Sequence, residues 1–213
     1  MQRWSVVVPA KRLDVAKTRL APLTATLSGG APAAHRELVL ALLGDTVAAA
    51  LASPAVGLVL VVTDDPRAAA VVTGLGARTV GDGPGRGLNA ALEHGARVAR
   101  ADGAGPLAAL NSDLPALRSD ELAEALAEAA GRPRSFVADT AGTGTTLLAV
   151  PAGELDPRFG PGSAAAHAAA GAVSLTGRWP GLRQDVDTPA DLAVARRLGV
   201  GPQTTGFLSS TVG

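Results

Sequence analysis

The chain has 213 residues, 47% of them hydrophobic and 18% charged, with 19 basic and 19 acidic side chains and no cysteine. This length suits one α/β domain with a sizeable core, and the balanced charge argues against a nucleic-acid-binding protein, which needs a continuous basic surface. The absence of cysteine excludes disulfides, thiolate nucleophiles and cysteine-ligated zinc.

Apolar runs rich in β-branched residues alternate with helical patterns along the chain. The runs predict strands at 6–8, 56–62, 79–80, 107–110, 136–138, 145–150 and 173–175. The helical patterns cover 34–52, 65–75, 88–101, 119–130, 163–170 and 189–198. This alternation predicts one α/β domain over residues 1–200, with a doubly wound, mostly parallel sheet.

Three segments need separate interpretation. Two apolar runs around 140–144 predict a β-hairpin insertion, and residues 201–213, which lack periodicity, predict a loosely attached C-terminal tail. The longest uncharged stretch, 46–63, has the length of a marginal membrane span, but Pro54 and Gly57 divide it into a helix end, a turn and a strand. The apolar stretch before Lys11 is too short for a signal peptide. We therefore expect a cytoplasmic protein without a membrane segment.

Both lysines of the chain, Lys11 and Lys17, follow the first predicted strand, and the other basic side chains are arginines. A lysine ammonium is a compact point charge, unlike the planar fork of arginine, so the two are not equivalent where a phosphate is bound. Ligands of doubly wound sheets bind beyond the carboxyl ends of the strands. The segment therefore predicts a phosphate-binding loop.

Carboxylates follow two later extended runs. Asp113 comes just after the strand at 107–110, and Asp185 precedes the last predicted helix. Mg²⁺ prefers oxygen ligands, commonly one or two carboxylates plus substrate phosphates. A turn-capping role remains open for Asp113, and Asp187 and Thr188 also suit a helix start. Together, Asp113 and Asp185 predict a magnesium site.

Glycine-rich loops supply further candidates. Gly160 and Ser163 lead directly into a predicted helix, whose start attracts an anion, although an ordinary serine N-cap is the alternative. The segment 139–146 offers hydroxyl donors to the same anion or is only a turn. Gly87 and Asn89 lie in a segment with weak dinucleotide-fingerprint spacing, which better fits a loop over a nucleotide base or ribose.

The histidines and one glutamate stripe suggest no chemistry. His35, His94 and His167 lack metal-ligand spacing, so we interpret them as surface or packing residues. Glu121, Glu124 and Glu128 recur at helical spacing and are most simply a solvated helix face.

Several motifs in chain order carry a family resemblance: VPAK at 8–11 with AKTRL at 16–20, GLNAAL at 87–92, NSDLP at 111–115, FGPGS at 159–163 and DVDTP at 185–189. They resemble the phosphoenolpyruvate or 2-phospho-L-lactate guanylyltransferases of deazaflavin coenzyme F-420 biosynthesis, over roughly residues 4–198. The resemblance implies a nucleotidyltransferase fold of the glycosyltransferase A type. It also implies transfer of GMP from GTP to the acceptor phosphate, with Mg²⁺ as the cofactor and release of pyrophosphate.

The resemblance also implies roles for particular residues. The catalytic residues would be Lys11, Lys17, Asp113 and Asp185, with Mg²⁺ held by Asp113, Asp185 and a third carboxylate, Asp187. The three-carbon acceptor would be bound by Thr145, Gly160 and Ser163, and the nucleotide by Lys11, Arg12, Lys17, Arg19, Gly87 and Asn89.

The sequence gives less information about the acceptor substrate and about protein partners. The composition, rich in Ala, Gly and Arg, is typical of a high-GC genome and favours phosphoenolpyruvate over 2-phospho-L-lactate, although no side chain distinguishes the two. A molybdopterin or sugar-phosphate nucleotidyltransferase is an alternative that needs a larger acceptor cavity. A non-catalytic nucleotide-binding regulator is an alternative from another class. The next enzyme of the pathway is a candidate partner, and the oligomeric state is not predicted.

Overall fold

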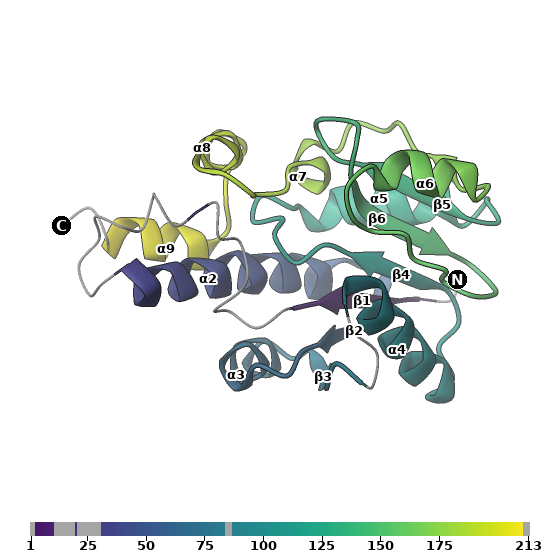
Figure 1. The fold of residues 1–213 in the computed structure, drawn as a ribbon, viewed down its shortest axis with the longest axis horizontal. Coiled ribbons are helices and arrows are strands. Elements are labelled where there is room, and N and C mark those ends of the chain that lie inside the picture. Colours follow the sequence, from purple (N-terminus) through teal and green to yellow (C-terminus); the bar gives the residue numbers. More distant parts are fainter. Residues whose placement is uncertain (1–2, 11–19, 21–30, 84–86, 211–213) are drawn as a thin grey trace.

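The computed structural model describes residues 3–10, 20, 31–83 and 87–210, and they form a sheet covered by helices on both faces (Figure 1). The strands are β1 (Trp4–Pro9), β2 (Val56–Val62), β3 (Arg78–Val80), β4 (Leu107–Leu110), β5 (Ser135–Ala138), β6 (Thr145–Val150) and β7 (Val173–Ser174). The helices are α2 (Ala31–Ala52), α3 (Pro66–Gly74), α4 (Leu88–Ala101), α5 (Ser119–Ala129), α6 (Ser163–Ala169), α7 (Pro180–Arg183), α8 (Pro189–Leu198) and α9 (Pro202–Ser210).

The described residues contribute seven strands to the sheet, in the order β3-β2-β1-β4-β6-β5-β7. Strand β1 pairs in parallel with β2 and β4, whereas β6 is antiparallel to both β4 and β5. The predicted doubly wound, mostly parallel sheet is thus confirmed. The predicted hairpin is formed by β5 and β6, and β6 pairs with β4, so the hairpin belongs to the main sheet.

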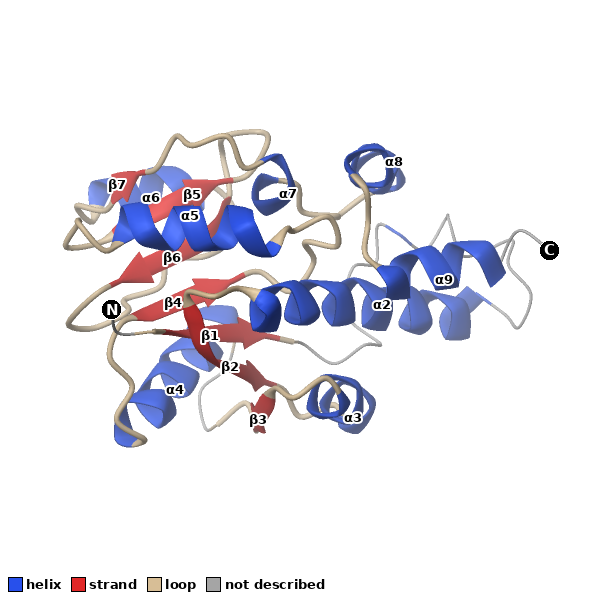
Figure 2. Cartoon of the chain, turned by 180° about the vertical axis from the view of Figure 1, so that it is seen from behind, coloured by secondary structure: helices blue, strands red, loops and turns tan. Residues whose placement is uncertain are grey.

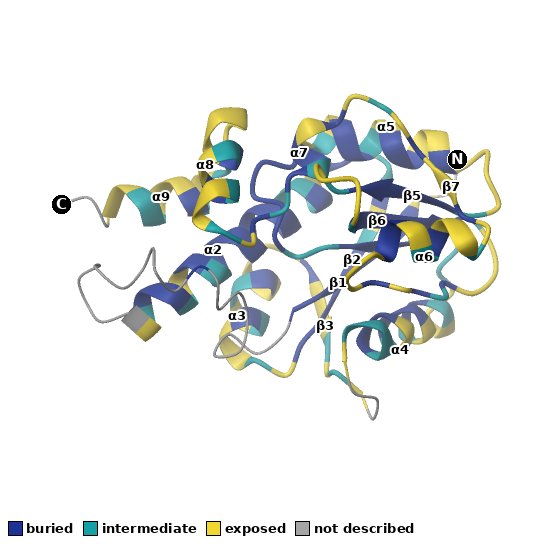
Figure 3. Cartoon of the chain, turned by 45° about the horizontal axis from the view of Figure 1, so that its top comes forward, coloured by how far each residue is buried: buried dark blue, intermediate teal, exposed yellow. Residues whose placement is uncertain are grey.

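Side chains that alternate along the strands fill one core on each face of the sheet. Val6 and Val8 of β1 belong to one hydrophobic cluster, with apolar residues of α2, α3 and α5, whereas Val7 belongs to a second cluster, with residues of α4 and α6. Gly95 lets α4 lie close to the sheet, because a Cβ at this position would stand 2.6 Å from Val7 Cγ1. The central strands β1, β4, β5 and β6 are therefore buried, as Figure 3 shows, whereas the edge strands β3 and β7 are mostly exposed.

Helix α9 lies beside α2 in both ribbon views (Figures 1 and 2). The Asp45 carboxylate of α2 accepts hydrogen bonds from the backbone N–H groups of Gln203 at 3.0 Å and Thr204 at 2.8 Å, at the start of α9. A carboxylate there satisfies amides that lack partners within the helix. Residues 202–210 thus differ from the loosely attached tail that the sequence predicts, because their stabilising partner is distant in the chain.

The uncharged stretch at 46–63 is divided as the sequence predicts. It contains the end of α2 at Ala52 and the start of β2 at Val56. Among the described residues, no helix combines the length and the hydropathy that a membrane span requires.

Candidate active site

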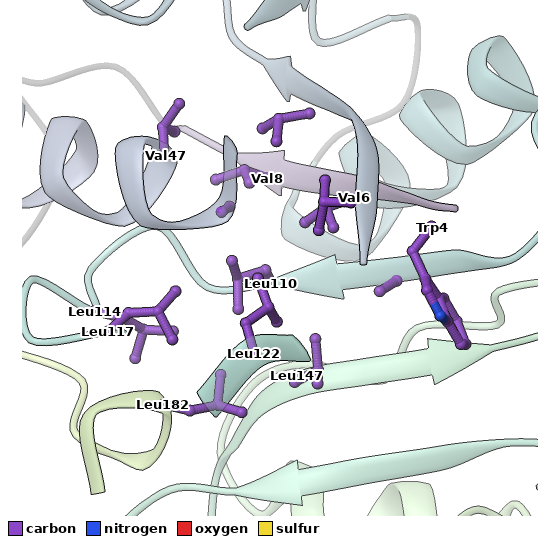
Figure 4. Close-up of a cluster of buried hydrophobic side chains, with 14 of the residues drawn as sticks. Trp4, Val6, Val8, Val47, Leu110, Leu114, Leu117, Leu122, Leu147 and Leu182 are labelled. Carbon is purple, nitrogen blue, oxygen red and sulfur yellow. The ribbon is translucent and has the colours of Figure 1, made fainter. Parts of the chain in front are cut away.

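The loop after β4 carries Asp113 and is held in place by the side chain and the backbone of the next residue, Leu114. Leu114 is buried in the core near Leu182 (Figure 4), and its backbone N–H donates to the Thr46 hydroxyl of α2 at 2.9 Å. That hydroxyl donates in turn to the Leu42 carbonyl oxygen at 2.8 Å. Asp113 itself is only 5% exposed. The loop therefore presents this carboxylate residue from a fixed backbone.

The segment that carries Asp185 lies directly against this loop. The backbone N–H of Val186 donates to the carbonyl oxygen of Asp113 at 3.1 Å. Val186 is fully buried, whereas Asp185 is half-buried. Two carboxylate residues that are far apart in the sequence are thus brought together on hydrogen-bonded segments. Their binding of a metal stays a prediction.

The donor chemistry of these segments suits Mg²⁺. Asp113 and Asp185 offer oxygen ligands, and Mg²⁺ commonly uses one or two carboxylates, keeping water and substrate phosphates for its other positions. In the part of the chain that the structure describes, no group of three or more His, Cys, Asp or Glu side chains is arranged to hold a metal ion. Asp187 is exposed, and its backbone N–H donates to Asp191 Oδ2 at 3.2 Å. Binding of a metal by Asp187 therefore stays a prediction, as it does for Asp113 and Asp185.

The start of α8 follows immediately and is capped locally. The Thr188 side chain accepts a hydrogen bond from the Asp191 backbone N–H at 3.2 Å, and the Thr188 N–H donates to the Asp191 carboxylate at 2.8 Å. This reciprocal pair is a capping box, with Pro189 in the first turn. The helix-start interpretation of Thr188 is thus confirmed.

Helix α7, which the sequence does not predict, leads into the Asp185 segment and is held by Glu121 of α5. The Glu121 carboxylate accepts hydrogen bonds from the backbone N–H groups of Gly181 at 3.3 Å and Leu182 at 2.9 Å. Burial raises the pKa of Glu121, an effect that these two donors oppose. The interpretation of the glutamate stripe as a solvated face is wrong at Glu121, which is 7% exposed.

We expect Glu121→Ala to lower the free energy of unfolding by about 2–3 kcal/mol, because the Gly181 and Leu182 amides lose their acceptor in a buried position. Glu128→Ala, on the exposed side of the same helix, is the matched control and should change this free energy by less than about 0.5 kcal/mol. Urea unfolding of both variants measures the difference. Equal losses would contradict an anchoring role for Glu121.

A second group of candidate residues surrounds His167 of α6. His167 Nδ1 lies 2.9 Å from the Thr145 hydroxyl at the start of β6, and Nε2 lies 2.9 Å from the Arg158 backbone nitrogen. Its ring packs near Phe136 and Phe159, with centroid distances of 5.9 and 5.2 Å. The packing role expected for this histidine is confirmed, but the sequence does not reveal its two hydrogen bonds. Its only signal is the four-residue spacing from Ser163, which puts both on one helix face.

The environment of His167 holds its imidazole neutral at physiological pH. The side chain is fully buried, and this desolvation, with smaller contributions from the charges of Arg134 and Arg158, lowers its pKa to about 4. Asp156 pairs with both arginines, at 3.1 and 3.2 Å, and opposes the shift. With both ring nitrogens occupied, this histidine is not placed to act as a general base.

The loop that contains Gly160 is held from a second direction by Asn89 of α4. The Asn89 side-chain amide donates to the Phe159 carbonyl oxygen at 3.0 Å, and its oxygen accepts from the Phe159 N–H at 2.8 Å. Gly87 precedes α4 with a φ of 96°, a left-handed value that glycine adopts without strain. The predicted contact of Asn89 with a nucleotide stays a prediction, and the structure shows that its side chain holds the backbone of Phe159, next to Gly160.

The predicted acceptor-binding residues lie around this loop. Gly160 has a φ of 134°, and its carbonyl oxygen accepts from the N–H of Ser163 at 3.1 Å. Ser163 is 2% exposed at the start of α6. The Ala164 N–H donates to the Thr143 carbonyl oxygen at 3.1 Å, which joins α6 to the loop before Thr145. The structure therefore brings the three predicted acceptor-binding residues into one region.

The predicted triphosphate-binding side chains follow strand β1 in the sequence. Strand β1 ends at Pro9, and the N–H of Ala10 continues its pairing by donating to the Val62 carbonyl oxygen at 2.9 Å. Lys11, Arg12, Lys17 and Arg19 lie outside the described residues.

Sequence comparisons link the chain to one family. Residues 4–175 match the family described as Guanylyl transferase CofC like. A phosphoenolpyruvate guanylyltransferase of Geodermatophilus obscurus is 66% identical over 208 residues, which cover 98% of this chain and 95% of that protein. A protein of the same name from Salinispora arenicola is 57% identical over 208 residues, covering 95% of this chain and 92% of that protein.

Solved structures share the fold at low sequence identity. A protein of Desulfovibrio desulfuricans G20 described as a nucleotide-diphospho-sugar transferase has a TM-score of 0.71 at 18% identity, covering 99% of this chain and 95% of that chain. A 4-diphosphocytidyl-2C-methyl-D-erythritol synthase has a TM-score of 0.62 at 15% identity, covering 93% and 99%. The expected nucleotidyltransferase type of sheet is thus confirmed.

Proposed function

The chain belongs to the CofC-like guanylyl transferase family, and on this premise we propose that it transfers GMP from GTP to the phosphate of phosphoenolpyruvate. The products would be enolpyruvoyl-2-diphospho-5'-guanosine, for coenzyme F-420 biosynthesis, and pyrophosphate. The observation that carries this proposal is 66% identity, over 98% of the chain, to a protein named for this activity.

The reaction needs positioning more than acid–base chemistry. An oxygen of the acceptor phosphate attacks the α-phosphorus of GTP, and the bond from this phosphorus to the oxygen that bridges to the β-phosphorus breaks. A phosphate monoester with a second pKa of about 6 is mostly dianionic at pH 7, so its nucleophilic oxygen needs no general base. This agrees with the buried, neutral state of His167. The protein's task is to hold two polyanions together and stabilise the developing charge.

Asp113 and Asp185 are the side chains that would hold Mg²⁺, with Asp187 as the third candidate. When bound, Mg²⁺ would supply positive charge against the triphosphate and the leaving pyrophosphate. The support from the structure is the Val186–Asp113 backbone bond, which brings the two carboxylate segments together. The catalytic role of these carboxylates would be to fix the position of that charge.

The substrates would be bound on either side of this centre. Lys11, Lys17, Arg12 and Arg19 would bind the GTP phosphates, and Gly87 and Asn89 would lie near the nucleoside. Thr145, Gly160 and Ser163 would bind phosphoenolpyruvate. The two anchors of the acceptor loop, from Asn89 and His167, support its use as a rigid binding element. We further propose that the reaction takes place in the cytoplasm, with the enzyme that consumes the product as a candidate partner.

Pyrophosphate release tests this function directly. The purified protein is incubated with Mg²⁺, each nucleoside triphosphate in turn, and either phosphoenolpyruvate or 2-phospho-L-lactate. We expect release with GTP and phosphoenolpyruvate. Faster release with 2-phospho-L-lactate would reassign the acceptor, and release only with a sugar phosphate or molybdopterin would reassign the reaction. Nucleotide binding without release in any mixture would indicate a non-catalytic regulator.

A further inference from the structure

The hydrogen bonds of His167 determine which ring nitrogen carries its proton. The Arg158 backbone N–H can only donate, so Nε2, at 2.9 Å from it, must carry the lone pair. A neutral imidazole has one N–H, which is then on Nδ1. The buried imidazole is therefore the Nδ1–H tautomer.

This tautomer orients the hydroxyl of Thr145. Because Nδ1 carries the proton, the Thr145 oxygen at 2.9 Å accepts that hydrogen bond. The hydroxyl must then direct its own proton to a different acceptor. Among the described residues, His167 is the sole hydrogen-bond partner of this hydroxyl. Thr145 is 3% exposed, and a buried hydroxyl donor without an acceptor costs free energy that a ligand oxygen would restore.

We propose that His167 is a positioning residue that holds Thr145 as a hydrogen-bond donor to an oxyanion of the three-carbon acceptor. The proposal rests on the proposed function, because it concerns how phosphoenolpyruvate is bound. A carboxylate or a phosphate dianion only accepts hydrogen bonds. If Thr145 instead donated to histidine, its oxygen lone pairs would face the substrate anion and repel it.

The surroundings of His167 restrict it to this arrangement. The ring contacts Phe136 and Phe159 at centroid distances of 5.9 and 5.2 Å, so rotation of the imidazole would collide with packed side chains. Rotation would also break the Arg158 bond, which fixes the start of the loop containing Gly160. One side chain therefore orients a substrate donor and fixes the loop beside it.

Two substitutions separate the two bonds of His167. In His167→Gln, the side-chain oxygen can take the place of Nε2 and accept from Arg158, but no donor to Thr145 remains. In His167→Asn, the shorter amide can take the place of Nδ1 and donate to Thr145, but the Arg158 acceptor is lost. Thr145→Val removes the hydroxyl at nearly constant volume. Thr146→Val is the matched control, because the Thr146 hydroxyl contacts the Val137 carbonyl oxygen instead.

Steady-state kinetics give the main readout. We expect Thr145→Val and His167→Gln each to raise the KM for phosphoenolpyruvate about tenfold, the loss of one hydrogen bond to a charged group. The KM for GTP and kcat should stay within about twofold of the wild-type values. Thr146→Val should retain the wild-type KM for phosphoenolpyruvate, whereas His167→Asn, which keeps the donor to Thr145 but loses the Arg158 bond, should raise this KM less than His167→Gln does. The double variant of Thr145→Val with His167→Gln should be no worse than Thr145→Val alone.

Other patterns would overturn the proposal. A normal KM for phosphoenolpyruvate in His167→Gln would show that Thr145 needs no orientation. Equal changes in kcat and both KM values in His167→Gln and His167→Asn would show that the histidine has only a structural role. Two-bond ¹H–¹⁵N NMR of the wild-type ring is independent of variant folding, and an Nε2–H tautomer would also overturn the proposal. Wild-type protein that releases no pyrophosphate would instead contradict the proposed function.

Inhibition by methyl phosphate identifies which oxyanion Thr145 contacts. Methyl phosphate carries the phosphate of the acceptor without its carboxylate. If Thr145→Val weakens inhibition by methyl phosphate about tenfold, the Thr145 hydroxyl contacts the phosphate of the acceptor. If inhibition is unchanged while the KM for phosphoenolpyruvate rises, the hydroxyl contacts the carboxylate. Unchanged values for both compounds would contradict any donor role for Thr145.

Discussion

Asp113→Asn is expected to lower the rate of pyrophosphate release by about 10²–10³-fold, the size of effect seen when one well-placed electrostatic group is removed from an active site. A neutral amide binds Mg²⁺ less strongly than a carboxylate does, so if Asp113 holds the ion as proposed, the positive charge that Mg²⁺ would supply to the triphosphate would be lost or misplaced. Because the two side chains have almost the same shape, the Leu114 anchor and the Val186 hydrogen bond should persist.

The measurement is kcat for GTP and phosphoenolpyruvate over a range of Mg²⁺ concentrations. Asp120→Asn is the control: it changes an exposed carboxylate on α5, and its rate should stay within about twofold of wild type. The Asp113 variant should unfold at a urea concentration close to that of the wild type. Full activity in a folded Asp113→Asn protein would remove this residue from the metal site.

Acidification from pH 6.5 to about 4 is expected to destabilise the protein by roughly 3 kcal/mol through His167 alone. The ordinary histidine pKa of 6.5 applies in the unfolded chain, and burial lowers it to about 4 in the folded protein. Between these values the unfolded state binds more protons, so stability rises with pH across this window. Above pH 6.5 the contribution is constant.

Carboxylates elsewhere in the protein titrate in the same pH range, so a variant is needed to isolate the contribution of the histidine. The pKa of Glu121 is raised by burial, which makes stability fall as pH rises above its ordinary value of 4.5. Burial alone would raise the pKa of Asp156, but hydrogen bonds and charge from Arg158 and Arg134 lower it, so its stabilisation is lost only below about pH 3.8. Both effects remain when His167 is replaced.

The experiment compares urea unfolding free energies of wild type and His167→Asn from pH 4 to pH 8. Asparagine does not titrate in this range, so the difference between the two curves reports the histidine. We expect the wild type to lose roughly 3 kcal/mol more than the variant as the pH falls from 6.5 to 4. Parallel curves would show that the imidazole is not held in its neutral form.

Local patterns along the sequence account for most of the fold. The apolar runs at 56–62 and 145–150 coincide with β2 and β6, and the helical pattern at 88–101 coincides with α4. Such elements are encoded by residues within a few positions of one another, through period-two or helical spacing. Local patterns do not predict helices α7 and α9. The carboxylates that stabilise their first turns, Glu121 for α7 and Asp45 for α9, lie far away in the sequence.

The candidate site also has one part that the sequence predicts and one part that only the folded structure shows. The sequence by itself identified the carboxylates Asp113 and Asp185 as candidates, because Asp113 follows a predicted strand and Asp185 precedes a predicted helix, and ligands of such sheets bind where strands lead into helices. Only the tertiary structure decided that the segments of these two carboxylates are hydrogen-bonded to each other. It also decided that His167 links the Thr145 hydroxyl to the backbone of Arg158, at the start of the loop that contains Gly160. Residue type and local spacing can be read directly from the sequence. Hydrogen bonds between distant segments and the pKa of a buried group depend instead on how the helices and strands pack in the folded protein.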